Sequence, residues 1–325
     1  MELPLSLQTA IEQEMEQRST KKLAVLAMEI SEGYRSGVPF NKGRYIRSEE
    51  DVLAYVSYRL PATYAAAYSA INRTRERFPD WSPKTMLDVG AGPGTAMWAV
   101  SATWDGLEGI TLLERDENMI AFGKRLSQYS PDTSIRQARW IKTNITKEWD
   151  MSPHDLVIAS YVLNELPQVK REAFIQQLWE KARDLLIIIE PGTQTGFQRI
   201  YQAKKQLLAL GAKMVAPCPH ERPCPLPEDD WCHFSQRLAR TKLHRTVKGG
   251  ELAYEDEKFS FLSMARTRKG TAIPGLVIRH PQIRKGHIAL RLCTPDGIKN
   301  TVVTRKDKGN FRKARELRWG SVLRV

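Results

Sequence analysis

Five short apolar segments dominate the middle of the chain, between Thr85 and Leu210. In order they are TMLDVGAG, ITLLER, ARWIKTN, DLVIASYVL and DLLIIIEPG, and a segment of helical length follows four of them. Strands that are apolar along their whole length are typical of a mostly parallel sheet with helices on both faces. The alternation therefore predicts an α/β fold with a doubly wound, Rossmann-like sheet.

The sequence predicts three domains. Residues 1–80 have apolar side chains at helical spacing and form a helical N-terminal region, with one kink expected at Pro61. Residues 81–265 hold the sheet, a cysteine-rich insert at 213–240 and closing strands after the insert. Residues 266–325 contain strand-like segments separated by Gly and Pro, which predict a small, basic, β-rich and OB-like domain.

A glycine-rich loop, LDVGAGPGT, ends the first apolar segment. Gly90, Gly92 and Gly94 allow the backbone to turn tightly and to approach a ligand at the edge of the sheet where ligands bind. The dinucleotide fingerprint requires glycine where this chain has Thr95, so the loop favours another nucleotide. Asp88, just before the loop, would repel a pyrophosphate and attract an ammonium or sulfonium group.

Glu114 ends the second apolar segment, where its carboxylate can accept hydrogen bonds from both hydroxyls of a ribose. LDVGAGPGT and ITLLERDENM together resemble the first two motifs of class I S-adenosylmethionine-dependent methyltransferases, over roughly Thr85 to Gly192. The resemblance implies that the chain binds S-adenosyl-L-methionine. A dinucleotide and an empty, vestigial pocket are the alternatives.

The same resemblance gives each cofactor-binding candidate a role. It places Asp88 near the methionine amino group, Glu114 on the ribose and Asn144 of WIKTN near the adenine. The loop residues expected under the methionine and ribose are Gly90, Ala91, Gly92 and Gly94.

The sequence does not identify catalytic residues. Amino-directed nucleic-acid methyltransferases place an Asn/Asp-Pro-Pro-aromatic tetrapeptide after the fourth strand, where this chain has ASYVLNELP instead. Tyr161, Asn164 and Glu165 could line the cofactor pocket; alternatively, Asn164 and Glu165 cap the following helix. Because methyl transfer can proceed through positioning alone, the sequence leaves open whether the chain is an enzyme.

Three of the four cysteines, Cys218, Cys224 and Cys232, lie in a proline-rich stretch that cannot form a regular helix or strand, and Cys293 follows far downstream. Their spacing lacks the short pairs of ordinary zinc sites. It is compatible with a [4Fe–4S] cluster, which takes four thiolates. Zinc and four structural thiols are the alternatives, and the histidines that could substitute as ligands are His220 and His233.

The net charge of +13 lies entirely in residues 241–325, which hold 20 Lys plus Arg against 7 Asp plus Glu. Such an excess in one region favours a surface that binds nucleic-acid phosphates over a merely soluble basic tail. Trp319 and Phe311 are available for stacking on bases. The phosphate-binding candidates are Arg279, Arg284, Lys285, Arg291, Lys299, Arg305, Lys306, Arg312, Lys313, Arg315 and Arg318.

The chain as a whole resembles the Rsm-type methyltransferase-like proteins, bacterial relatives of mitochondrial factors that help assemble the small ribosomal subunit. The resemblance runs from about Tyr55 to the carboxyl end and rests on RLPATYAAAY, LDVGAGPGT, ASYVLNELP, IIIEPGT, CPHERPCPLPEDDWCHFSQR and EDEKFSFL, with a late fourth cysteine. It implies that Cys218, Cys224, Cys232 and Cys293 bind a [4Fe–4S] cluster and that the protein binds small-subunit rRNA. We expect an assembly factor; the alternatives are an active rRNA methyltransferase and a small-molecule methyltransferase with a basic tail.

The N-terminal segment MELPLSLQTAIEQEMEQRST carries glutamates where a targeting peptide needs cations, and no apolar run is long enough to span a bilayer. We therefore expect a cytoplasmic protein that does not bind membranes. We also expect a monomer.

Overall fold

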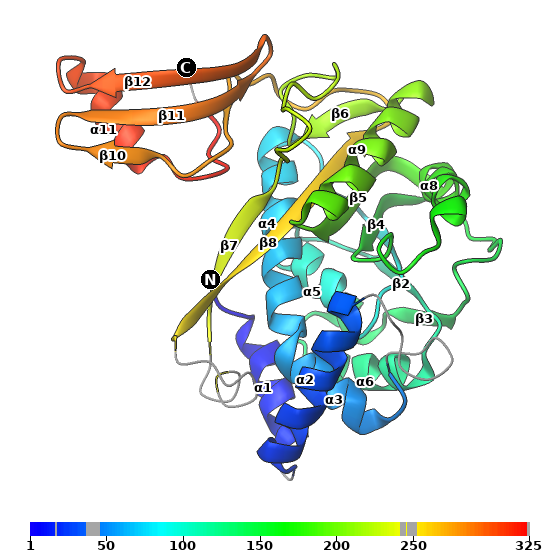
Figure 1. The fold of residues 1–325 in the computed structure, drawn as a ribbon. Helices are drawn as coiled ribbons and strands as arrows, with labels where there is room; N and C mark the ends of the chain where they lie inside the picture. Colours follow the sequence, from blue (N-terminus) through cyan, green and yellow to red (C-terminus); the bar gives the residue numbers. More distant parts are fainter. Residues whose placement is uncertain (17, 37–45, 241–244, 246–251, 324–325) are drawn as a thin grey trace.

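The structure is a computed structural model, and it describes residues 1–16, 18–36, 46–240, 245 and 252–323. Within these residues, an eight-stranded sheet has the order β3-β2-β1-β4-β5-β8-β6, and β7 pairs with β8. Figure 1 shows helices on both faces of this sheet and a smaller sheet at the carboxyl-terminal end of the chain. The strands of the large sheet are β1 (Thr85–Val89), β2 (Gly109–Glu114), β3 (Arg139–Lys142), β4 (His154–Ser160), β5 (Ala182–Pro191), β6 (Lys213–Ala216), β7 (Phe234–Ala239) and β8 (Tyr254–Ala265).

Strands β1 to β5 are parallel, and β8 runs antiparallel to β5, β6 and β7. The predicted α/β, Rossmann-like sheet is confirmed. All five segments predicted from their apolar runs are strands, and β8 is the main closing strand.

The central strands bury side chains on both faces. Leu156 and Ile158 of β4 point into one core, whereas Val157, between them, points into the other. This alternation explains why the strands are apolar at every position. The first face is covered by α4 (Leu60–Arg77), α5 (Thr95–Ser101), α6 (Glu117–Gln128) and α7 (Thr133–Arg136), and the second by α8 (Gln168–Lys181) and α9 (Gln194–Ala209).

Three further helices, α1 (Leu5–Met15), α2 (Thr20–Ser36) and α3 (Glu49–Tyr58), pack on the outside of the first face. Near the expected kink at Pro61 the helix is interrupted at a single residue: α3 ends at Tyr58 and α4 begins at Leu60, while Arg59 between them keeps a right-handed helical backbone. Pro61 lies in the first turn of α4, where the missing N–H costs no helical hydrogen bond.

The small sheet is antiparallel and consists of β9 (Leu276–Val277), β10 (Gln282–Arg284), β11 (His287–Thr294) and β12 (Gly297–Thr304). Helix α11 (Lys308–Glu316) covers one face, where Ala314 packs against Ile288, Leu290 and Leu292. The small β-rich region is confirmed. The described residues form an open four-stranded sheet with a helix, not the five-stranded barrel of an OB fold.

The predicted domain boundaries after residues 80 and 265 stay predictions, although both fall between elements. No described helix combines the length and apolar character that crossing a bilayer requires.

Candidate cofactor site and cysteine-lined cavity

The glycine-rich loop joins β1 to α5 and has the backbone conformation that its glycines predict. Gly90, Gly92 and Gly94 have φ angles of 75°, 54° and 83°, all in the left-handed region that favours glycine. The backbone N–H groups of Gly90 and Ala91 donate to the carbonyl of Leu113 in β2, over 2.9 and 3.0 Å. These bonds hold the loop at the carboxyl edge of the parallel strands.

Asp88, in β1, has a buried and unpaired oxygen. The residue is 1% exposed, and its Oδ2 has no hydrogen-bond partner among the described residues. Burial and, secondarily, the charge of Glu114 raise the pKa of Asp88 to about 8. A buried carboxyl group beside a glycine loop suits a ligand that brings an ammonium or sulfonium group, so Asp88 fits S-adenosylmethionine.

Glu114 ends β2 and already binds the glycine loop. Its Oε2 accepts a hydrogen bond from the Gly92 N–H over 2.8 Å, and its Oε1 accepts from the N–H groups of Arg115 and Asp116. A carboxylate oxygen has further lone pairs, so Glu114 can also accept from a ribose hydroxyl. Asn144 lies in an exposed turn after β3, where its Oδ1 accepts from the backbone and hydroxyl of Thr146.

Tyr161 follows β4 with a left-handed backbone (φ 60°), which is strained for an aromatic residue. Its hydroxyl donates to Oε1 of Glu257 in β8 over 2.9 Å. Arg59, between α3 and α4, forms an ion pair with the same carboxylate at 2.9 Å and lies over the Tyr161 ring. The N-terminal helices are therefore tied to the sheet beside the end of β4.

Asn164 and Glu165 do not cap the following helix, because Pro167 is the N-cap of α8 and no side chain caps it. Asn164 has a buried Oδ1 without a partner among the described residues. Burial raises the pKa of Glu165 to about 7, with Arg115 opposing the effect. Of the two alternatives for these side chains, the structure contradicts the helix cap, and the pocket-lining role stays a prediction.

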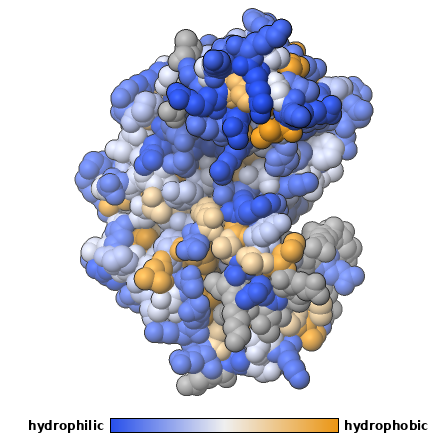
Figure 2. Space-filling model, turned by 90° about the vertical axis from the view of Figure 1, so that its left-hand side faces the viewer, coloured by the Kyte–Doolittle hydropathy of each residue, from blue (hydrophilic) through white to orange (hydrophobic). Residues whose placement is uncertain are grey.

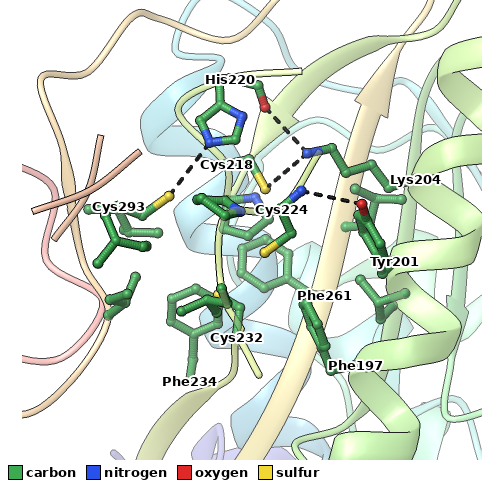
Figure 3. A pocket seen from close by; sticks show the side chains of 18 residues that line it. Phe197, Tyr201, Lys204, Cys218, His220, Cys224, Cys232, Phe234, Phe261 and Cys293 are labelled. Atoms are coloured by element: carbon green, nitrogen blue, oxygen red, sulfur yellow. Dashed lines mark hydrogen bonds between the residues drawn. The ribbon is translucent and has the colours of Figure 1, made fainter. Parts of the chain in front are cut away.

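All four cysteines line one cavity of about 40 Å³ (Figure 3). Cys218, Cys224 and Cys232 belong to the loop between β6 and β7, whereas Cys293 belongs to β11 of the small sheet. Phe234 and Phe261 contribute apolar surface to the same cavity. The fold thus brings together the four side chains that the sequence singled out, from two separate regions of the chain.

The donor set of the cavity fits a cluster bound by four thiolates. Burial, and secondarily the other cysteines, raise the pKa of Cys293 to about 12 and that of Cys232 well above its usual range. Iron would favour the thiolate forms, because a metal ligand must lose its proton. Among the described residues, no three Cys, His, Asp or Glu side chains converge on a single metal ion; the four cysteines instead surround a shared space.

The two histidines of the insert differ in their surroundings. His220 lines the cavity, with its Nε2 3.8 Å from the Cys293 sulfur. His233 packs between the rings of Trp231 and Trp319, and its Nδ1 lies 3.2 Å from the Trp231 carbonyl. Only His220 is therefore placed to take part in a metal site.

Charged side chains join the cysteine loop to the small sheet. Asp230 of the loop forms ion pairs with Arg279 and with Arg291, the latter at 3.2 Å. Arg73 of α4 donates to the carbonyl of Gly320 near the carboxyl end. Arg279 and Arg291, two of the eleven phosphate-binding candidates, therefore form ion pairs where the cysteine loop contacts the small sheet, a contact that we call the joint.

The remaining basic candidates and the two aromatic candidates are placed differently. Trp319 packs against His233 and His280, and Phe311 packs against the core of the small sheet, so both rings are partly buried. Lys299 pairs with Asp296. The candidates that are exposed and form no ion pair with another described residue are Arg284, Lys285, Arg305, Lys306, Arg312, Lys313, Arg315 and Arg318. Figure 2 shows mostly hydrophilic residues over the small sheet, with a hydrophobic patch among them.

Sequence reasoning missed several residues beside these sites. Lys204 of α9 reaches the cysteine cavity, and Glu190, near the end of β5, has no exposed surface and accepts a hydrogen bond from the Leu163 N–H. Arg59 and Glu257 meet although 198 residues separate them. No local pattern distinguishes these charged residues from surface charges.

Comparisons with known proteins identify the family of the chain. The family model described as mitochondrial small ribosomal subunit Rsm22 matches residues 49–324. The human mitochondrial ribosome assembly protein METTL17 is 29% identical over 296 residues, which cover 84% of this chain and 62% of METTL17. Rsm22-cox11 tandem protein 2 of Schizosaccharomyces pombe is 26% identical over 330 residues, which cover 85% of this chain and 43% of that protein.

The chain thus spans less than two thirds of the length of either relative. Among solved structures, magnesium protoporphyrin IX methyltransferase of Synechocystis PCC 6803 is similar with a TM-score of 0.43 and 11% identity, over 73% of this chain and 91% of the enzyme. Because the family model matches most of the sequence, the predicted family is confirmed: the chain belongs to the mitochondrial small ribosomal subunit Rsm22 family.

Proposed function

We propose that the protein is an assembly factor that binds S-adenosylmethionine, holds a [4Fe–4S] cluster and docks on rRNA of the immature small ribosomal subunit. The observation that carries this proposal is the shared cavity of the four cysteines, because it joins the cofactor-binding sheet to the basic region. Its relatives support the ribosomal role, since METTL17 is described as a ribosome assembly protein.

In the cofactor site, Asp88 would pair with a cationic group of S-adenosylmethionine, and Glu114 would accept from its ribose. The glycine loop provides close backbone approach to the ligand. The unpaired oxygen of Asp88 supports this assignment, because a buried acceptor without a partner is costly until a ligand satisfies it.

Cys218, Cys224, Cys232 and Cys293 would hold the cluster, which when bound supplies four metal–thiolate bonds across the joint. The protein itself contributes the apolar walls of the cavity and the ion pairs of Asp230 with two arginines. A cluster in this place would fix the orientation of the basic sheet. The cluster would then have a structural role, because it would hold the basic sheet in the orientation that RNA docking requires.

The RNA surface would consist of the exposed cations of the small sheet and α11. Because Trp319 and Phe311 are packed, we expect binding to depend on phosphate contacts and not on base stacking. Such binding weakens steeply with salt. We also propose a cytoplasmic location and a monomeric chain; cell fractionation and light scattering would test these two points.

The test incubates anaerobically purified protein with immature small subunits and methyl-labelled S-adenosylmethionine. Stable binding without label in the rRNA supports the assembly factor, whereas stoichiometric label selects an rRNA methyltransferase. Absence of any binding to the subunits or to rRNA contradicts both.

A Cys293→Ser variant tests the joint. We expect it to lose iron and ribosome binding together, because the fourth ligand comes from the small sheet. Retained iron with full binding in this variant would contradict the role of Cys293.

A further inference from the structure

Lys204 is a lysine buried in the wall of the cysteine cavity. It lies on α9, is 4% exposed, and extends its ammonium group toward the cysteine loop (Figure 3). The ammonium donates to the carbonyl of Arg222 over 2.9 Å and to that of His220 over 3.5 Å. Its third close neighbour is the sulfur of Cys218, at 3.7 Å.

The charge of Lys204 has no carboxylate partner among the described residues, since its polar contacts are two carbonyls and one sulfur. Buried charges are normally paired or bound to metals, because leaving water is costly for them. Carbonyl groups satisfy the donors but do not neutralise the charge. An anionic group bound in the cavity would supply the missing charge.

We propose that Lys204 is the charge partner of the cysteine-bound cluster and donates an N–H···S hydrogen bond to Cys218. This inference rests on the proposed cluster. Hydrogen bonds to sulfur and net charge are among the factors that set the potential of a cluster. A nearby ammonium stabilises the more negative, reduced state, so Lys204 raises the reduction potential.

Lys204 also positions the loop. The carbonyls that it binds belong to residues between Cys218 and Cys224, so one side chain of a rigid helix fixes the backbone that joins two ligands. Lys204 is therefore a positioning residue as well as a source of charge. The adjacent Lys205 offers a matched control, because it is exposed and lies over the Tyr201 ring.

The experiment compares the full chain with Lys204→Met, Lys204→Gln and Lys205→Met after anaerobic reconstitution with iron and sulfide. Iron per chain and the midpoint potential are measured, the latter by a redox titration followed by electron paramagnetic resonance. At the wild-type midpoint, we expect the ratio of oxidised to reduced cluster to rise about tenfold in both Lys204 variants. For a one-electron couple this equals a shift of about 59 mV to more negative potential. Lys205→Met should match the wild type.

Wild-type potential and iron content in Lys204→Met would overturn the role of Lys204. A wild-type chain that takes up no iron would instead contradict the proposed cluster. If Lys204→Met alone fails to retain iron, Lys204→Gln still reports the potential. Amide hydrogen exchange of residues 218–224 in iron-free protein then tests positioning: exchange about tenfold faster than in wild type supports it, and unchanged exchange overturns it.

Discussion

Replacing Asp88 by Asn should change how the stability of the ligand-free protein depends on pH. Asp88 is fully buried and has a pKa of about 8, against an ordinary value of 3.8. Between these two values, the folded protein keeps the proton and the unfolded chain loses it. The wild type must therefore lose stability as pH rises from about 4 to about 8, whereas Asp88→Asn is free of this effect.

The expected magnitude follows from the linkage of about 1.4 kcal/mol per pH unit for one proton. Between pH 5.5 and 7.5, the free energy of unfolding of Asp88→Asn should gain about 2.7 kcal/mol relative to wild type. The buried amide of the variant has unsatisfied donors, which cost about 1–3 kcal/mol. That cost does not change with pH, so the slope is the quantity to measure. Other carboxyl groups with a raised pKa, such as Glu165 and Glu190, affect both proteins equally and cancel in the difference.

The assay is urea unfolding of both proteins at pH 5.5, 6.5 and 7.5. Asp105→Asn, at an exposed position, serves as the control and should show no slope relative to wild type. S-adenosylmethionine should raise the melting temperature of the wild type much more than that of Asp88→Asn. A stability difference that stays constant with pH would refute the reasoning, because it would mean that Asp88 is ionised and paired in the folded protein.

Two further substitutions test the glycine loop and the RNA surface. Gly90→Ala should destabilise the protein by about 1–3 kcal/mol more than Gly286→Ala in urea unfolding. Both positions have positive φ, but only the new Cβ at Gly90 would lie 2.6 Å from a Val162 methyl carbon, whereas space is open at Gly286. Lys285→Gln should reduce the slope of log affinity for rRNA against log salt by about 0.9, as expected for one lost phosphate contact. The same substitution at the exposed Lys124 of α6 should leave the slope unchanged, and equal effects would argue against a localised RNA surface.

The sheet and the glycine loop could be predicted because their signals are local. Strand β5 is apolar at successive positions, since Ile187 and Ile188 face opposite cores. The positive φ angles at Gly90 and Gly94 follow a spacing that is visible in the sequence. Long-range contacts leave no such pattern, and the resemblance to a family, not spacing, predicted that Cys293 joins the other cysteines.

Other features depend on how distant side chains meet. The sequence suggests that Lys204 lies on the solvent-exposed face of a helix, but in the structure the cysteine loop covers it. The sequence makes Trp319 a candidate for stacking on bases, but the fold places its ring against His233 and His280. Arg59, at the interruption between α3 and α4, forms an ion pair with the distant Glu257, a contact that no local pattern indicates.

Strand β8 lies inside the large sheet although it is the last strand of that sheet to be synthesised. Among the described residues, β6 and β7 pair only with β8. On a ribosome, the loop with Cys218, Cys224 and Cys232 would emerge before either of its flanking strands has a neighbour. Three thiols would therefore leave the exit tunnel on an unanchored segment, and the fourth would emerge after the sheet can close. Insertion of the proposed cluster would thus be confined to a late stage of the protein's own biosynthesis.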